Sequence, residues 1–257
     1  MTLSSLTHVA PLAQRTHILV GDRGLQRLSQ THLLLAGLGG VGSYAAEALV
    51  RAGIGRLTLA DHDVVADSNL NRQLPALHST IGEKKLQVMA QRLRDINPAV
   101  ELTLLDRFLS AEEMPTLLTT GFDFAIDAID SLNSKVALLI GALEAGVPIA
   151  SSMGAGGRLD PSQLVLGDVM DSTICPLARQ IRKRLRRRGI GRGVLAVWST
   201  EAARPPLPPE ATDRGRPRAV NGTISYMPAL FGLTLAGAVL HRLLQPVISD
   251  RVASERL

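Results

Sequence analysis

The sequence predicts a Rossmann-like α/β fold with a doubly wound, mostly parallel sheet. Residues 32–36 form an apolar run that is typical of a buried parallel strand, and a glycine-rich segment follows at once. Residues 43–52 then predict a helix rich in alanine, and residues 57–60 predict a second strand that ends at Asp61. This order of strand, helix and strand is the repeating unit of a doubly wound sheet.

The alternation of helices and strands continues along the chain. Residues 82–97 place apolar side chains at helical spacing and stop at Pro98, so they predict a helix. We expect another helix over residues 134–145, closed by Gly146. Further strands are predicted over residues 100–105, 122–128 and 147–151.

The pattern changes after Gly154. Residues 158–166 alternate enough to predict a strand, residues 177–188 predict a basic helix, and residues 229–244 predict the last helix. Residues 204–218 are rich in proline and charge, so they predict a mobile loop or lid rather than regular structure.

The composition limits the classes of protein to consider. The chain has 257 residues, of which 46% are hydrophobic, and this suits one large domain with a sizeable core. Aromatic residues make up only 3%, which argues against stacked exposed rings that bind single-stranded nucleic acid. Because Cys175 is the only cysteine, the chain forms neither an internal disulfide nor a four-cysteine zinc site.

We expect a cytoplasmic protein that is not inserted in a membrane. Residues 1–14 carry no Lys or Arg ahead of an apolar run, which a signal peptide would require. The apolar stretch 226–240 is short for a membrane span and contains Pro228. It therefore predicts a buried helix packed on the sheet.

The net charge of +5 is concentrated in one segment. Eight of the 28 Lys and Arg residues lie between Arg179 and Arg192, with no acidic residue among them, so the rest of the chain is net acidic. Leu177, Ile181 and Leu185 recur at four-residue spacing and would anchor a helix on the core.

The remaining faces of this helix predict an RNA-binding surface. Close positive charges without an acidic partner repel one another, which favours an anionic partner over a merely solvated helix. The segment contains no aromatic residue, so we expect it to contact RNA backbone and shape rather than bases. The expected RNA-binding residues are Arg179, Arg182, Lys183, Arg184, Arg186, Arg187 and Arg188.

The glycine-rich segment predicts a nucleotide site. Gly37, Gly39 and Gly42 have the spacing of a dinucleotide-binding turn, and they lie between a strand and a helix. Such glycines allow backbone N–H groups to approach phosphate, and the helix N-terminus favours an anion there. Asp61, at the end of the next strand, can hold ribose hydroxyls. These features alone suit NAD as well as ATP.

The polar groups beyond Asp61 favour nucleotidyl transfer over hydride transfer. Arg72 and Lys85 can neutralise the charge that develops on phosphate in a transition state. Asp130, at the end of a predicted strand, can hold Mg²⁺, which takes only one or two carboxylates and keeps several waters. A hydride-transfer enzyme needs none of these groups.

The motifs GLGGVG, DHD, SNLNRQ, Lys85 and DAIDS, in this order, resemble the adenylating domain of the ubiquitin-activating-like superfamily, which includes ThiF, MoeB and HesA. The resemblance implies a single adenylating domain over residues 1–257, completed by C-terminal strands and helices, with its nucleotide-binding core at about 15–152 and an insertion at about 170–220. It also implies a catalytic set of Arg15, Arg72, Lys85 and Asp130, with Asp130 as the Mg²⁺ ligand and Arg15 lent across a homodimer to the partner's ATP. The implied nucleotide-binding residues are Gly37, Gly39, Gly40, Gly42, Asp61, Asp63, Asn69, Arg72, Lys85 and Ser131.

One branch of this superfamily is similar along nearly the whole chain. The segment GAGGRLDP at 154–161, the WSTE element at 198–201 and the basic segment resemble the tRNA threonylcarbamoyladenosine dehydratases. That resemblance implies ATP-dependent dehydration of a modified adenosine in tRNA through an acyl-adenylate, with sulfur-transfer proteins as further partners. The chain departs most from the branch in its proline-rich stretch at 204–218.

Three other functions remain open at this point. Superfamily members that activate ubiquitin-like sulfur carrier proteins usually have paired CxxC zinc ligands, which this chain lacks. A nicotinamide-dependent oxidoreductase would use the same glycine turn, and an RNA-binding adaptor could retain the fold without activity. For Cys175 we favour a buried structural role over that of an acyl acceptor, because cyclisation needs no enzyme nucleophile.

Overall fold

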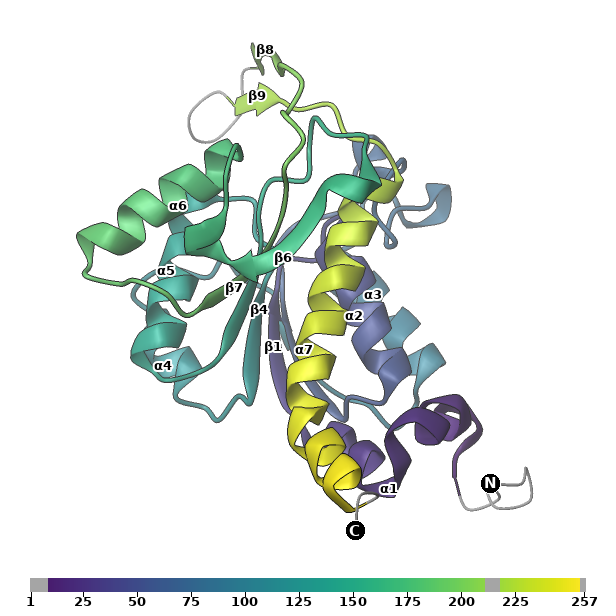
Figure 1. Cartoon of the computed structure of the whole chain (residues 1–257). Coiled ribbons are helices and arrows are strands. Elements are labelled where there is room, and N and C mark those ends of the chain that lie inside the picture. Colours follow the sequence, from purple (N-terminus) through teal and green to yellow (C-terminus); the bar gives the residue numbers. More distant parts are fainter. Residues whose placement is uncertain (1–8, 211–217, 255–257) are drawn as a thin grey trace.

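The computed structural model describes residues 9–210 and 218–254, and within them a seven-stranded sheet forms the centre of the molecule (Figure 1). The strand order is β3-β2-β1-β4-β5-β7-β6. All neighbouring strands are parallel except β6 and β7, which are antiparallel. The strands are β1 (His32–Ala36), β2 (Arg56–Ala60), β3 (Glu101–Leu105), β4 (Phe124–Asp127), β5 (Ile149–Ser152), β6 (Leu164–Asp168) and β7 (Val194–Ser199).

Helices cover both faces of the sheet, so the predicted doubly wound α/β fold is confirmed. One face carries α1 (Gln14–Gln30), α2 (Gly42–Ala52), α3 (Lys85–Ile96) and α7 (Tyr226–Ser254). The other carries α4 (Met114–Leu118), α5 (Leu132–Glu144) and α6 (Pro176–Arg187). Short 3₁₀ helices lie at Pro11–Ala13, Asp67–Asn69, His78–Thr80, Pro161–Gln163 and Val169–Asp171.

Two of the predictions need correction. The strand expected over residues 158–166 begins only at Leu164, because Pro161 starts a 3₁₀ turn in which Asp160 accepts a hydrogen bond from the Ser162 N–H. The expected irregular loop at 204–218 contains regular structure: β8 (Leu207–Glu210) and β9 (Arg218–Val220) pair as an antiparallel ribbon. Residues 211–217 of that loop lie outside the described residues.

Helix α7 packs on α2 and α1 and against the sheet, as predicted for a buried helix (Figure 1). Residues 226–247 are long and apolar enough to cross a membrane by length and composition, but 61% of their most apolar window is buried inside the protein. The close approach of α7 to α2 depends on Gly232, where an added Cβ would lie 2.2 Å from the Val41 carbonyl oxygen. This contact presses α7 against the residues that begin α2, beside the glycine turn.

Candidate active site

A pocket of about 800 Å³ opens at the carboxyl ends of the parallel strands. Its wall is formed by the glycine turn after β1, the residues after β2, β4 and β5, and the first residues of α6. This edge is where open parallel sheets bind ligands, and the turn lies beside the point between β1 and β4 where the strand order reverses. Of the expected nucleotide and metal residues, those that line it are Gly37, Gly39, Gly40, Asp61, Asp63, Arg72, Lys85, Asp130 and Ser131.

The glycine turn owes its shape to two of its glycines. Gly37 has a φ of +93°, and an added Cβ there would lie 2.7 Å from the Ala128 carbonyl oxygen. At Gly42 an added Cβ would lie 1.7 Å from the Gly37 carbonyl oxygen. Gly42 is not part of the pocket wall, and its predicted contact with the nucleotide stays a prediction. Its observed role is to let the turn close on itself.

Asp61 is fixed by the backbone around it. One carboxylate oxygen accepts a hydrogen bond from the Leu38 N–H at 2.5 Å, and the other accepts from the Asp63 N–H at 2.8 Å. The carboxylate therefore ties the glycine turn to the end of β2 before any ligand binds. Each oxygen keeps a free lone pair, which suits the expected contact with ribose hydroxyls.

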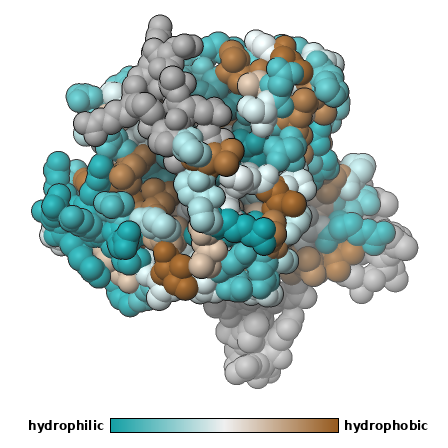
Figure 2. Space-filling view, turned by 90° about the horizontal axis from the view of Figure 1, so that it is seen from above, coloured by the Kyte–Doolittle hydropathy of each residue, from teal (hydrophilic) through white to brown (hydrophobic). Residues whose placement is uncertain are grey.

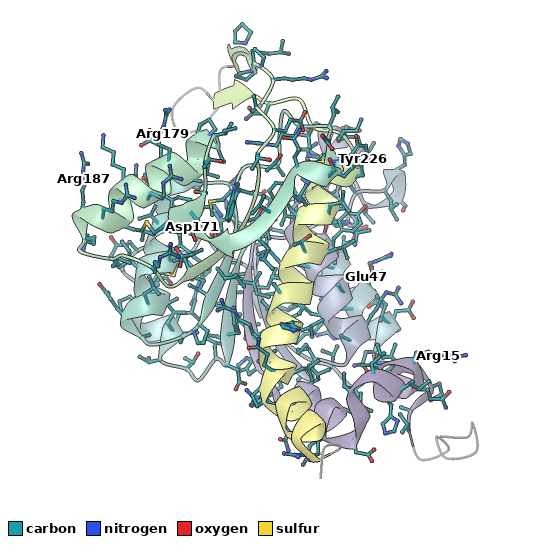
Figure 3. All side chains as sticks on the ribbon, in the orientation of Figure 1. Arg15, Glu47, Asp171, Arg179, Arg187 and Tyr226 are labelled. Atoms are coloured by element: carbon teal, nitrogen blue, oxygen red, sulfur yellow. The ribbon has the colours of Figure 1, made fainter. Side chains whose placement is uncertain are left out.

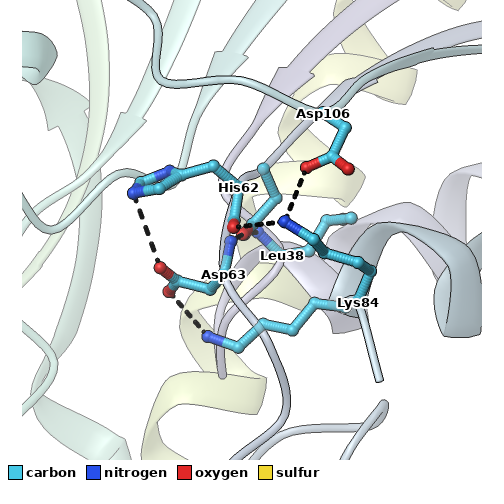
Figure 4. A network of polar contacts seen from close by, with 7 residues as sticks. Leu38, His62, Asp63, Lys84 and Asp106 are labelled. Atoms are coloured by element: carbon cyan, nitrogen blue, oxygen red, sulfur yellow. Dashed lines mark hydrogen bonds and ion pairs between the residues drawn. The ribbon is translucent and has the colours of Figure 1, made fainter. Parts of the chain in front are cut away.

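Two consecutive lysines differ in their contacts, and Figure 4 shows those of Lys84 with Asp106 and His62. Lys85 lines the pocket, its side chain is only 6% exposed, and its ammonium donates to the Asp63 carboxylate at 2.8 Å. Lys84 lies outside the pocket wall and donates to Asp106 at 3.2 Å and to the His62 carbonyl at 3.3 Å. Lys85 thus offers a positive charge that is already desolvated and oriented, as expected of a group that meets phosphate.

The SNLNRQ segment provides one charge and amide side chains with different roles. The Arg72 guanidinium is held by the Ser68 carbonyl at 2.7 Å, and burial lowers its pKa, although arginine stays charged at neutral pH. Asn69 was expected to bind nucleotide, but it lies outside the pocket wall and its side-chain oxygen accepts from the Ala66 N–H at 3.2 Å. This contact is structural, and the assignment of Asn69 to nucleotide binding stays a prediction. Gln73, which we did not assign, lines the pocket, and its buried carbonyl oxygen has no partner among the described residues.

Asp130 is carried by a loop that a buried ion pair holds in place. Asp127 and Lys135 are both fully buried, with the Lys135 ammonium 2.6 Å from the Asp127 carboxylate and 2.9 Å from the Ser152 carbonyl. The second Asp127 oxygen accepts from the Ile129 N–H at 3.1 Å, one residue before Asp130. This network gives the loop at the end of β4 a fixed shape.

The residues present fit a magnesium ion. Asp130 is exposed in the pocket wall and offers one carboxylate, which is the usual protein share for Mg²⁺ when phosphate oxygens and waters complete its shell. Among the described residues, the only clustered trio of candidate metal ligands is Asp61, His62 and Asp63. The carboxylates of this trio already accept backbone N–H groups and the Lys85 ammonium.

Two further residues line the far side of the pocket, and of these Arg158 was not predicted from the sequence. Arg158, in the loop between β5 and β6, lines the pocket and is only 3% exposed. Its Nη1 donates to the carbonyls of Gly154 at 2.5 Å and Gly156 at 2.8 Å, whereas Nε and Nη2 have no partner among the described residues. Cys175, buried as expected, lines the pocket just before α6 begins.

The expected RNA-binding surface faces solvent. Leu185 and Ile181 are buried, which confirms the anchoring stripe of α6. Hydrophilic side chains gather over α6 in the view from above (Figure 2), and Arg179 and Arg187 project away from the body (Figure 3). Arg182 and Arg184 are half-buried: the first donates to the Ser172 carbonyl and the second to the Asn133 side chain at 2.6 Å. These two hold the helix in place.

Arg15 lies far from the pocket of its own chain. It is exposed near the start of α1, at the opposite end of the molecule from Tyr226, whose helix borders the pocket (Figure 3). Within one chain it therefore does not join the other expected catalytic residues.

The fold and the pocket define an adenylating type of α/β protein, and the chain belongs to the ThiF family, whose model matches residues 13–256. The Bacillus subtilis tRNA threonylcarbamoyladenosine dehydratase is 34% identical over 245 residues, which cover 93% of this chain and 96% of that protein. The crystal structure of the Escherichia coli tRNA N6-threonylcarbamoyladenosine dehydratase TcdA in complex with ATP matches with a TM-score of 0.82 and 35% identity, covering 91% of this chain and 94% of TcdA. The Escherichia coli molybdopterin-synthase adenylyltransferase is 33% identical over 152 residues, which cover 59% of each protein.

Proposed function

We propose that this chain is an ATP-dependent enzyme that dehydrates threonylcarbamoyladenosine in tRNA through an acyl-adenylate. One observation carries the proposal: a single pocket wall joins the preorganised nucleotide residues to the first residues of the basic helix α6. The likeness to dehydratases covers nearly the whole chain, whereas the likeness to the adenylyltransferase covers little more than half. This difference favours a tRNA substrate over a sulfur carrier protein.

In the first step, the substrate carboxylate attacks the α-phosphorus of ATP. A new oxygen–phosphorus bond forms, and the bond to pyrophosphate breaks. Attacker and target are both negatively charged, so fixed positive charge lowers the barrier. Lys85 and Arg72 provide it from the pocket wall, while the backbone of the glycine turn steadies the nucleotide.

In the second step, the activated carbonyl is attacked by an atom of the same substrate side chain. AMP leaves and a ring closes, so the net change is the loss of one water from the substrate. Holding both reacting groups in one molecule gives a large entropic advantage. The protein therefore needs no nucleophile of its own, which agrees with a buried structural role for Cys175.

Asp130 would hold Mg²⁺ together with the phosphate oxygens of ATP. The ion would supply charge neutralisation for the leaving pyrophosphate. The buried pair of Asp127 and Lys135 keeps the Asp130 loop in position, and Ser131 precedes α5, so its helix N-terminus faces the pocket.

The proposed enzyme is a cytoplasmic homodimer, with sulfur-transfer proteins as further partners. The placement of Arg15, exposed and remote from its own pocket, supports a contribution to the partner's site. Mixing Arg15→Ala with Lys85→Ala protein tests this, because a mixed dimer would contain one intact site. We expect two inactive preparations to recover roughly a quarter of wild-type activity after subunit exchange, since half the dimers are mixed. If no activity returns, Arg15 does not act across an interface.

Mass analysis of nucleosides from tRNA treated with protein and ATP tests the reaction. We expect threonylcarbamoyladenosine to lose one water, with AMP and pyrophosphate as the other products. Asp130→Ala should abolish all three changes. Formation of ADP would contradict adenylation, and adenylation of a small carrier protein without any change in tRNA would instead support the sulfur-carrier function.

A further inference from the structure

Arg158 is a buried cation that the proposed adenylation chemistry does not use. The side chain is 3% exposed, and it forms no ion pair with any residue that the structure describes. The nearby acid Glu201 is already committed, because one of its oxygens accepts from the N–H groups of Leu159 at 2.9 Å and Asp160 at 2.8 Å. A buried charge without a counter-charge is costly, so its presence points to an anion that binds there.

The geometry of the guanidinium narrows the class of ligand. Nη1 is fixed by the carbonyls of Gly154 and Gly156, which sets the orientation of the whole planar group. The two nitrogens without a partner, Nε and Nη2, lie on one edge of the guanidinium and donate in parallel. This edge matches the two oxygens of a carboxylate or phosphate, which arginine binds through paired hydrogen bonds.

The position of Arg158 in the fold favours the carboxylate of the substrate over a phosphate of ATP as the anion that it binds. The nucleotide residues of the glycine turn and Asp61 follow β1 and β2, and Lys85 pairs with Asp63 on that side. Arg158 follows β5, which lies across β4 from β1 in the sheet. The loop that carries Arg158 is thus separated by β4 from the strands that position Asp61 and Lys85.

The same side adjoins the helix expected to bind RNA. Gly154 is close to both Arg158 and Cys175, since an added Cβ at this glycine would be 3.7 Å from Arg158 Nη1 and from Cys175 Sγ. Cys175 immediately precedes α6. The pocket wall at residues 154–156 consists of glycine and alanine, so an incoming group meets little side-chain bulk.

We propose that Arg158 binds the carboxylate of the modified adenosine and holds it toward the nucleotide. This inference rests on the proposed function and names the residue that recognises the acyl substrate. Arg158 would bind the carboxylate both before and during its attack on the α-phosphorus of ATP. Replacing Arg158 therefore raises KM for tRNA more than it lowers kcat. ATP binding does not depend on it.

The test compares binding of two tRNAs to three proteins. The wild type, Arg158→Lys and Arg158→Ala are each titrated with tRNA that carries the threonylcarbamoyl group and with tRNA that lacks it. Arg158→Lys retains the positive charge and donors for the glycine carbonyls but loses the paired edge. The exposed Arg94→Ala on α3 is the matched control for loss of one positive charge.

We expect the wild type and Arg94→Ala to prefer the modified tRNA by about ten- to hundredfold, the range of a charge-assisted paired hydrogen bond. Arg158→Lys should bind both tRNAs with the affinity of the unmodified one, while its Kd for ATP stays unchanged. A retained preference in Arg158→Lys would overturn the inference. So would an equal loss of affinity for ATP, which would assign the fork to a nucleotide phosphate.

The proposed function has a separate readout. If wild-type protein leaves threonylcarbamoyladenosine unchanged, the proposed function fails whatever Arg158 does. If the wild type is active and Arg158→Lys shows an unchanged KM for tRNA, only the role of Arg158 fails. Thermal unfolding of each variant identifies a purely structural role, which would lower Tm without changing the preference between the two tRNAs.

Discussion

The nucleotide side of the pocket and the basic face of α6 both present positive charge, but they hold it differently. Lys85 is almost fully buried, and its ammonium lies 2.8 Å from the Asp63 carboxylate. In contrast, three arginines at the end of α6 are exposed and form no ion pair with any residue that the structure describes: Arg186, Arg187 and Arg188. A buried, oriented charge can stabilise a specific transition state, because it needs no reorganisation during the reaction. Exposed charges are screened by salt and suit reversible attachment to a polyanion. We therefore expect the buried charge of the pocket to act in the reaction and the exposed charges of α6 to act in binding tRNA.

The largest expected effect is on stability, and it comes from the buried ion pair of Lys135 and Asp127. Lys135→Ala leaves the Asp127 carboxylate buried without its partner, so the free energy of unfolding should fall by about 3–5 kcal/mol. Urea denaturation measures this change. The control, Lys84→Ala, removes an exposed pair with Asp106 and should cost at most about 1 kcal/mol. Equal losses in the two variants would show that this side is no more rigid than the surface.

The second effect concerns catalysis. Lys85→Ala should slow AMP formation in the presence of ATP and substrate tRNA by about a hundredfold or more, because the variant no longer places an oriented charge on the phosphate. The adjacent Lys84→Ala should stay near the wild-type rate, since Lys84 lies outside the pocket wall. A wild-type rate in Lys85→Ala would remove this residue from the catalytic set.

The third effect concerns the affinity for tRNA and its dependence on salt. Replacing Arg186, Arg187 and Arg188 with Ala should weaken tRNA binding and reduce the slope of log K against log salt by about 3, which is roughly one unit for each phosphate that is no longer neutralised. Binding of ATP should not change, because none of the three lines the pocket. Filter binding at several salt concentrations gives the slope. An unchanged slope would mean that this face does not bind RNA.

The smallest expected effect is the difference between two arginines of α6, Arg182 and Arg187. Arg182 donates to the Ser172 carbonyl and so fastens the helix, while Arg187 projects into solvent (Figure 3). Arg182→Ala should lower the free energy of unfolding by about 1 kcal/mol and alter the salt slope less than Arg187→Ala does. The reverse order of slopes would show that Arg182 leaves its internal partner to bind RNA.

The sequence predicted the fold well where its signals were local. The predicted strand at 32–36 coincides with β1, and the predicted helix at 82–97 contains α3. It missed α1, which is interrupted by Gly21 at a φ of +67°, so its helical pattern is broken. It also did not predict β7, although Val194–Ser199 is a buried apolar run of the same kind as β1.

The sequence predicted the location of the candidate site, but it did not predict which of the motif residues line the pocket. Motif order selected Asp61, Lys85 and Asp130, because the carboxyl ends of parallel strands bring such residues to one edge. The same motifs also selected Gly42 and Asn69, which the fold uses for its own turns. A motif records which residues occur together, not whether each one faces a ligand or its own backbone.

The sequence by itself determined the class of fold, the glycine turn after β1 and the separate basic segment, because each depends on residues close together in the chain. Only the tertiary structure decided which side chains share the pocket. Arg158 is the clearest example: in the sequence it is one arginine after a pair of glycines. Its burial, its fixed Nη1 and its open edge arise from the packing of the loop after β5 against the residue before α6. Such long-range packing places a charge where water cannot compensate it, and composition and spacing do not contain that information.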